Sequence, residues 1–369
     1  MGMLRVLLAM TVCVNHYVAT PGLSLPFVPG PGARLSVEIF FIISGFYMSL
    51  ILTDKYVGAG GVKLFYLNRA VRLYPVYLLI LGLYFALVLV LKLKTGNWTF
   101  LTPVVQLGSL VDPLVKAWLF ISNLTFFGQD ALFLFSVNPD TGALCLDCQP
   151  SLPGWLGLVI PQAWSVEVEM LFYLFAPLFV AWNTRVLATV VAVMIAVKMY
   201  LYAVPGVSEY WQFRFPPSAL GLFLLGMLSH RLYRRFKTAP FLRGTTAKAA
   251  CALFMAYLLA FSWVPGNDYV KSMLCYPLAF LCIPPLFALS KSNAFDRSFG
   301  ELSYPVYLIH QIVLFLATYF ITSGPMVIHW AIGLTLAVSW ALHHFVQVPV
   351  DRVRQAWVDR DHARARAQA

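Results

Sequence analysis

The chain has 369 residues, of which 60% are hydrophobic and only 11% are charged, and its mean hydropathy is +0.76. Soluble domains are roughly half apolar and a quarter charged, so these values exclude an ordinary soluble domain and place most of the chain in lipid. The net charge of +11 does not indicate a nucleic-acid partner, because the basic residues form short clusters between apolar segments. Such clusters are typical of membrane orientation signals.

Ten apolar segments are long enough to span a membrane as helices. We therefore expect an all-α, polytopic integral membrane helical bundle of about ten transmembrane helices. The predicted spans are residues 4–20, 35–53, 74–93, 164–182, 185–204, 216–233, 248–264, 272–290, 303–322 and 326–346. They form a membrane domain at 1–350, followed by a short tail at 351–369. The first apolar run continues into Asn15, His16 and Tyr17 without a cleavage-type sequence, so we expect this helix to stay uncleaved.

The distribution of basic residues predicts the orientation of the chain. If the N-terminus lies inside, all but seven of the 26 lysines and arginines belong to the inner segments; the seven are Arg34, Lys92, Lys94, Lys116, Lys198, Arg214 and Lys271. Positive charge collects on the cytoplasmic side, so both termini are predicted to be cytoplasmic. The external loop at about 95–163 then carries Asp112, Asp130, Asp140 and Asp147.

Two features of this external loop lead to separate predictions. The apolar stretch 114–127 contains Lys116 and follows a proline, so we expect an interfacial or re-entrant segment rather than a span. Cys145 and Cys148 have C-x-x-C spacing. One such pair is too few for a structural zinc site, which needs four ligands, and no metal site is predicted. A local disulfide is favoured in an oxidising compartment, with free thiols as the alternative.

Ionisable residues within spans are candidates for function, because a charge at mid-membrane costs about 2.5–3.5 kcal/mol on insertion scales. Arg5 and His16 are separated by about three helical turns and share one face of the first helix. The alternative is a snorkelling arginine and a histidine bonded to a neighbouring helix. In the second span, Glu38 lies one turn inside, and Ser44-Gly45 offers small residues for close helix packing.

Arg69 and Arg72 follow the second span and project from one helical face. Guanidinium groups suit paired phosphate oxygens, although simple positive-inside anchoring is the alternative. In the fourth span, Glu169 and Tyr173 share a face, whereas Glu167 points elsewhere.

The ninth span contributes one polar stripe, Ser303, Tyr307 and His310. Taking all candidates together, the inner surface holds Arg69 and Arg72, the middle His310, and the outer half His16, Glu38 and Glu169. This division predicts a polar pocket that opens outward and a phosphate-binding pair at the opposite face. An acyl transferase with a phosphorylated donor inside and a hydroxyl acceptor outside would need that arrangement.

Five motifs in this order resemble the acyltransferase-3 family of bacterial membrane O-acyltransferases, and the resemblance covers nearly all of the chain. The motifs are Arg5-x10-His16, residues 36–46, Arg69-x-x-Arg72-x-x-Pro75, Trp164 to Tyr173, and Ser303 to His310. The resemblance implies an acyl-CoA donor, expected to be acetyl-CoA, and no permanently bound cofactor. It also implies a hydroxylated glycan or lipid-linked acceptor and a place in the bacterial inner membrane.

The resemblance further implies catalytic roles for His16, Glu38, Glu169 and His310, with His16 at the centre. His16 would remove the acceptor proton or carry the acyl group transiently, and a carboxylate would orient its imidazole. The residues expected to bind substrates are Arg5, Arg69, Arg72, Trp164, Ser165, Tyr173, Ser303 and Tyr307.

The sequence departs from the family pattern at two positions. Glu38 stands where an aspartate is usual, and Gln347-Val348-Pro349 stands where many members have Glu-x-Pro, so Gln347 is assigned no role. Some relatives carry a hydrolase-like extension. Since the printed sequence has none, we expect the membrane domain alone, or a partner, to handle the acceptor.

Two rival functions use the same residues. A transporter would use the intramembrane charges to bind a solute or relay protons, although the paired broken helices of such proteins are not evident. A non-catalytic subunit of a polysaccharide assembly complex is the third interpretation. The acceptor, the acyl chain, the choice between direct transfer and an acyl-enzyme, and the oligomeric state all stay open.

Overall fold

The structure is a computed structural model that describes residues 1–25, 28, 30–56, 60–146, 148, 150–239, 242–320 and 326–368, with side chains described as far as 360. The described chain is predominantly α-helical. Two parts of the sequence predictions lie outside the described residues: Asp147 of the external loop, and the last two residues of the predicted span at 303–322.

A helix coincides with each of the ten predicted spans. These helices are α1 (Gly2–Val18), α2 (Gly32–Asp54), α3 (Gly61–Thr95), α6 (Trp164–Ala181), α7 (Thr184–Ala203), α8 (Pro216–Phe236), α9 (Thr245–Ala260), α10 (Asp268–Ser290), α12 (Ser303–Phe320) and α13 (Met326–Leu342). Among the described residues, seven helical segments are long and apolar enough to cross a membrane. The prediction of an all-α chain with several membrane-length helices is therefore confirmed.

Three helices explain why seven segments, rather than ten, meet that criterion. Helices α1 and α9 are apolar but shorter, and α8 ends in a basic turn that contains Arg234 and Arg235. The number of crossings and the side of each terminus accordingly stay predictions. Helix α3 is longer than the span predicted within it, because it begins at Gly61 rather than near residue 74. Its first turns are anchored by Phe65, which is fully buried and packs against Tyr173.

The remaining elements are short, apart from the last helix. They are α4 (Thr102–Leu110), α5 (Pro113–Thr125), α11 (Ala294–Glu301), α14 (Val348–Gln368), the strands β1 (Ser136–Val137), β2 (Leu144–Cys145) and β3 (Leu152–Pro153), and the single turns η1 (Ala131–Phe133), η2 (Gly154–Gly157), η3 (Pro161–Ala163), η4 (Tyr210–Arg214) and η6 (His343–Gln347). The strands form one antiparallel sheet in the order β2-β1-β3.

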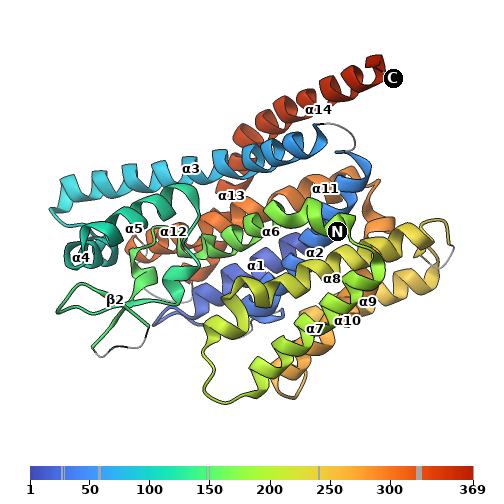
Figure 1. Cartoon of the computed structure of the whole chain (residues 1–369). Helices are drawn as coiled ribbons and strands as arrows, with labels where there is room; N and C mark the ends of the chain where they lie inside the picture. Colours follow the sequence, from blue (N-terminus) through green and yellow to red (C-terminus); the bar gives the residue numbers. More distant parts are fainter. Residues whose placement is uncertain are drawn as a thin grey trace.

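The region between α3 and α6 forms a small layer at one end of the bundle, on the side away from the N-terminus (Figure 1). The apolar stretch 114–127 forms α5, which has 13 residues and is too short to span a bilayer. Cys145 and Cys148 are joined in a disulfide, as favoured from the sequence. Helix α3 runs along one flank of the bundle, and α14 lies against it.

Helix α2 occupies the centre of the bundle and packs against α1, α6, α8 and α10. Its contact with α8 depends on two glycines. A Cβ added to Gly45 would lie 1.9 Å from the carbonyl oxygen of Phe223, and one added to Gly226 would lie 1.9 Å from that of Ile42. The prediction that Ser44-Gly45 marks a close helix contact is therefore confirmed.

Helix α11 fixes the start of α1. The Asp296 carboxylate accepts hydrogen bonds from the backbone N–H groups of Gly2 and Met3, at 2.8 and 2.9 Å. Such a carboxylate satisfies amides that have no partner within the helix. This cap holds the first turn of α1 beside α11 and so brings Arg5 close to Glu301.

Candidate active site

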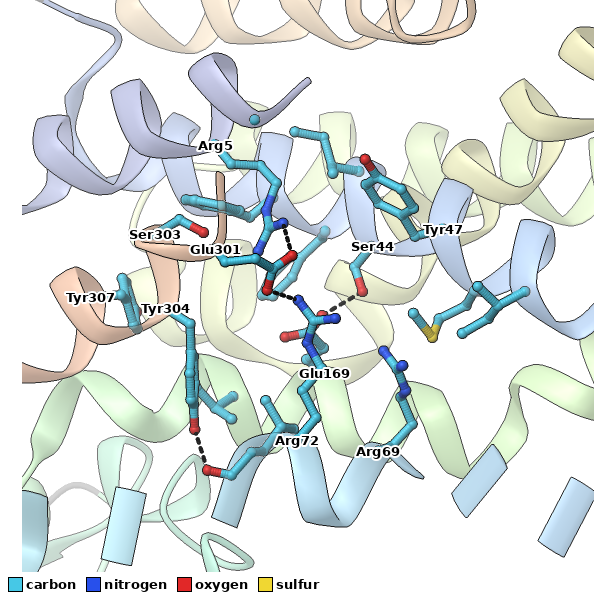
Figure 2. A pocket seen from close by; sticks show the side chains of 18 of the residues that line it. Arg5, Ser44, Tyr47, Arg69, Arg72, Glu169, Glu301, Ser303, Tyr304 and Tyr307 are labelled. Carbon is cyan, nitrogen blue, oxygen red and sulfur yellow. Dashed lines mark hydrogen bonds and ion pairs between the residues drawn. The ribbon is translucent and has the colours of Figure 1, made fainter. Parts of the chain in front are cut away.

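A cavity of about 390 Å³, here the inner cavity, lies between α1, α2, α3, α6 and the α11–α12 corner (Figure 2). Five basic and three acidic side chains line it, which gives it an excess of positive charge. These are Arg5, Arg69, Arg72, Lys291, Arg297, Glu169, Asp296 and Glu301. Arg69 and Arg72 point into it from one face of α3, as their spacing predicted.

Glu301 holds two of these arginines together. Its carboxylate accepts a hydrogen bond from Arg72 at 2.6 Å and one from Arg5 at 3.3 Å. Sequence analysis missed Glu301, because it lies in a short amphipathic helix between two predicted spans. A carboxylate two residues before the polar stripe that begins at Ser303 was the available signal.

Arg69 is held differently. Among the described residues it has no ion pair, its Nε is buried without a hydrogen-bond partner, and its guanidinium lies 5.9 Å from the centre of the Tyr173 ring. Glu169 instead accepts hydrogen bonds from Ser44 and Tyr173, which confirms that Glu169 and Tyr173 share a face. Arg69 is thus a cation with unused donors inside the inner cavity.

A second cavity of about 850 Å³, here the outer cavity, is lined by residues of α1, α2, α12, the region between α5 and α6, and η4, and it is rich in aromatic side chains. His16 lines it, together with Arg34 and Arg214. Its aromatic lining comprises Phe133, Trp155, Trp164, Tyr210, Trp211, Phe213 and Tyr307. All eight predicted substrate-binding residues line one cavity or the other: Trp164 the outer, Tyr307 both, and the remainder the inner.

His16 and His310 form a directed hydrogen-bonded pair. The ring planes differ by 6° with centroids 5.0 Å apart, and His16 Nδ1 lies 2.8 Å from His310 Nε2. His310 Nδ1 lies 3.2 Å from the Val306 carbonyl, which can only accept, so Nδ1 of His310 carries the proton. In a neutral ring its Nε2 must then accept from the Nδ1–H of His16. The Nε2 of His16 is left unprotonated, as a base or nucleophile requires.

The expectation that Glu38 or Glu169 lies beside His16 and orients its imidazole is corrected. Glu169 lines the inner cavity, where it is bonded to Ser44 and Tyr173. Glu38 is fully buried, and its carboxylate is 2.9 Å from Lys198 Nζ, which is also fully buried. Tyr202 and Tyr276 donate to the same carboxylate at 3.0 and 2.7 Å. An opposite charge in the apolar interior attracts Glu38 more strongly than a neutral imidazole can. His310 takes the place foreseen for a carboxylate.

The two cavities meet at Val37 and Tyr307, which line both. The Tyr307 hydroxyl lies 2.9 Å from the Gln162 carbonyl and 2.7 Å from the Ser165 hydroxyl. Because the carbonyl can only accept, Tyr307 donates to it and accepts from Ser165. This polar contact fixes the ring at the junction, one helical turn from His310.

The loop before η1 is clamped beneath the outer cavity. Glu167 accepts from the backbone N–H groups of Gly128 and Asp130 at 2.7 and 2.6 Å, which confirms that it points away from Glu169. Asp130 accepts from the Tyr210 hydroxyl at 3.1 Å, while its other oxygen is buried without a partner. Burial, together with the Glu167 carboxylate, raises the pKa of Asp130 to about 8.

Comparison with known proteins identifies the family. A family model described as an acyltransferase domain matches residues 1–344. The chain belongs to the acyltransferase-3 family. No solved structure is significantly similar to this acyltransferase-3 domain.

Several named relatives support the assignment. Proteins named "Putative O-acetyltransferase" from Staphylococcus aureus strains COL and N315 are 22% identical over 355 residues, which is 86% of this chain and 52% of theirs. The acyltransferase-3 domain thus spans about half the length of these curated relatives. A protein of Rhizobium radiobacter named "Protein 2 in picA locus" is 29% identical over 168 residues, 44% of this chain and 73% of its own.

Proposed function

We propose that the protein is an O-acyltransferase of the bacterial inner membrane. It would transfer an acyl group, expected to be acetyl, from cytoplasmic acyl-CoA to a hydroxyl of a sugar or polysaccharide-type acceptor at the outer half of the membrane. The observation that carries the proposal is the pair of cavities that share Tyr307: Arg69 and Arg72 line one, and His16, whose Nδ1 is bonded to His310, lines the other.

The inner cavity supports an anionic donor. Arg69 has unused donors, and Arg72 faces it from the next turn of α3. Planar guanidinium groups match the paired oxygens of a diphosphate, which acyl-CoA carries. The pantetheine arm would then extend past Ser44 and Ser303 toward the junction at Tyr307.

The outer cavity supports the transfer step. In the direct route, His16 Nε2 takes the proton of the acceptor hydroxyl as its oxygen attacks the thioester carbonyl. The C–S bond breaks, and the imidazolium returns the proton to the departing CoA thiolate. In the acyl-enzyme route, Nε2 attacks the thioester carbonyl, the C–S bond breaks and CoA leaves as the thiolate. The acceptor oxygen then attacks the acyl group, the N–C bond breaks, and the hydroxyl proton passes through the freed Nε2 to the thiolate. Both routes need the same nitrogen free, and His310 acts as a positioning residue that fixes the tautomer.

The first test separates an enzyme from a transporter. Purified protein given radiolabelled acetyl-CoA should release CoA slowly by hydrolysis, and faster when a suitable glycan is present. His16→Ala should remove both. If no acyl-CoA releases CoA while proteoliposomes accumulate a solute, the transporter interpretation replaces this one.

The orientation has its own test. Reporter fusions after residues 60 and 240 should behave as cytoplasmic, and a fusion near residue 140 as external. The motivating observation is that most basic residues lie on one side of the predicted spans. An external signal at residue 60 would place the inner cavity on the wrong side for cytoplasmic acyl-CoA.

A further inference from the structure

Arg34, at the start of α2, is a cation without a charged partner. Its guanidinium lies 4.6 Å from the centre of the Tyr202 ring and 5.1 Å from that of Phe213. Its hydrogen bond to the Gln212 side-chain oxygen is long, 3.5 Å, and its Nε is buried with no partner. Within the described chain it forms no ion pair. The side chain is therefore oriented by aromatic rings, with donors to spare.

Arg214 repeats this pattern on the same wall. It stacks on Phe133 at 4.1 Å and on Trp164 at 4.6 Å. One nitrogen is 3.5 Å from Glu209, whose side chain is largely exposed, and Nη1 is buried without a partner. At that length, with an exposed carboxylate, the pair is weak. Two guanidinium groups in one cavity thus keep unused N–H donors.

The other charges near the outer cavity do not balance them. The charged side chains that line it are Arg34, Arg214 and Glu209. The Asp130 carboxyl lies near Arg214, but burial, together with the Glu167 carboxylate, raises the pKa of Asp130 to about 8, and Glu167 is bound by backbone N–H groups. Glu38 is paired with Lys198. A partly desolvated guanidinium with unused donors carries a free-energy cost that a bound anion would offset. The excess of positive charge in this cavity therefore favours a negatively charged substrate.

The rest of the lining suits a sugar. Trp155 and Trp211 line the cavity and are 38% and 39% exposed. Such rings offer broad apolar surfaces for the C–H faces of a pyranose, while an arginine supplies the charge-assisted hydrogen bond. The cavity therefore offers aromatic surfaces for a sugar ring and arginines for an anion, next to the His16 that would act on the hydroxyl.

We propose that the acceptor is anionic: a glycan that carries a carboxylate or phosphate near the hydroxyl to be acylated, with Arg34 and Arg214 as its binding residues. This inference rests on the proposed O-acyltransferase function and adds the charge class of the acceptor. The anion could belong to an acidic sugar or to the diphosphate of a lipid-linked glycan, and the experiment separates these two sources.

Binding is measured on the full chain in detergent by quenching of tryptophan fluorescence, since three tryptophans line the outer cavity. The probes are polygalacturonate oligomers, their fully methyl-esterified forms, which are neutral, and farnesyl diphosphate as a lipid diphosphate. We expect one anionic probe to bind at least about tenfold more tightly than the neutral oligomer. Preference for polygalacturonate assigns the charge to the sugar, and preference for farnesyl diphosphate assigns it to the lipid carrier.

Variants of Arg34 test whether this residue is responsible for the preference for an anionic probe. Arg34→Gln should weaken binding of the preferred probe about tenfold and leave binding of the neutral oligomer unchanged. Arg34→Lys should retain part of the preference. Lys116→Gln removes an exposed positive charge from outside the cavity and is the matched control; it should change nothing. If Arg34→Gln does not fold, the unaltered protein still decides, because its preference should shrink between low and high salt.

Equal binding of the charged and neutral oligomers, or no quenching by any probe, would overturn the anionic acceptor. So would a preference that survives Arg34→Gln intact. The proposed transfer reaction is tested apart from this, by His16-dependent release of CoA from acetyl-CoA without acceptor. A protein that releases CoA but ignores the charge of the sugar remains an acyltransferase with a neutral acceptor.

Discussion

The inner and outer cavities both contain arginines, but they hold them in opposite ways. In the inner cavity, Arg5 and Arg72 each form an ion pair with the Glu301 carboxylate. In the outer cavity, Arg34 and Arg214 lie on aromatic rings and keep unused donors. An anion that binds Arg5 or Arg72 must compete with Glu301, whereas one in the outer cavity meets cations that are only weakly paired. Arg69, which has no ion pair in the described chain, is the exception in the inner cavity.

The largest effect should come from the histidine that faces the outer cavity. His16→Ala should abolish acyl transfer while leaving acyl-CoA binding intact, since general-base catalysis alone contributes about 10²–10⁴ in rate. His16→Gln should be nearly as inactive, because an amide cannot shuttle a proton. The measurement is transfer at matched expression, with donor binding checked on purified protein.

His310→Gln sharpens the same test. A glutamine oxygen could still accept from His16 Nδ1–H, so this variant should keep more activity than His16→Gln. Near-normal transfer by His16→Gln would make that histidine structural and leave His310 as the leading base.

The next effect should fall on the donor. Arg69→Ala and Arg72→Ala should each raise the KM for acyl-CoA by about 10–100-fold, the range for a lost charge-assisted hydrogen bond. Lysine at either position should rescue only partly, because an ammonium cannot reproduce the planar fork. Full activity of the double variant Arg69→Lys, Arg72→Lys would show that the two arginines only anchor the helix at the membrane surface and do not bind the donor.

Glu301→Gln should change the inner cavity in the opposite direction. Removing the carboxylate frees Arg5 and Arg72 for the donor, so the KM for acyl-CoA should fall by roughly 3–10-fold, at some cost in thermal stability. Enzyme kinetics and a melting curve measure both. A KM that rises instead would show that Glu301 positions the arginines rather than competing with the donor.

The smallest effect should be a pH dependence of stability. The pKa of Asp130 is about 8 in the folded chain and about 4 when unfolded, so the folded state keeps a proton that the unfolded state releases. The contribution of protonated Asp130 to the free energy of unfolding is therefore fully present below about pH 4 and is lost as the pH rises toward 8.

Asp130→Asn mimics the protonated form and can still accept from Tyr210. Compared with the unaltered protein, it should lose less thermal stability between pH 6 and 8.5, by roughly 1–3 °C. Parallel melting curves of the two proteins across that range would exclude the assignment.

The local sequence was enough to predict where the helices lie and which side chains share one face of a helix. Apolar runs of about twenty residues located the helices, and the spacings of Arg69 with Arg72 and of Glu169 with Tyr173 correctly gave their shared faces. These features depend on periods of one helix and require no knowledge of its neighbours.

Tertiary structure decided which faces meet. Lys198 stood alone in its predicted span, and its pairing with Glu38 could have been suggested only as two buried charges in need of each other. The contact of His16 with His310 joins residues 294 positions apart in the chain, and Glu301 reaches Arg5 across a similar separation.

The sequence by itself determined a helical membrane protein, its acyltransferase-3 motifs, and a set of polar residues that apolar helices would not carry without reason. Only the tertiary structure decided that these residues divide between two cavities, that Glu38 belongs to neither, and that Arg34 and Arg214 join His16. The physical reason is that depth and face follow from one helix, whereas the partner of a buried charge depends on which helices pack together.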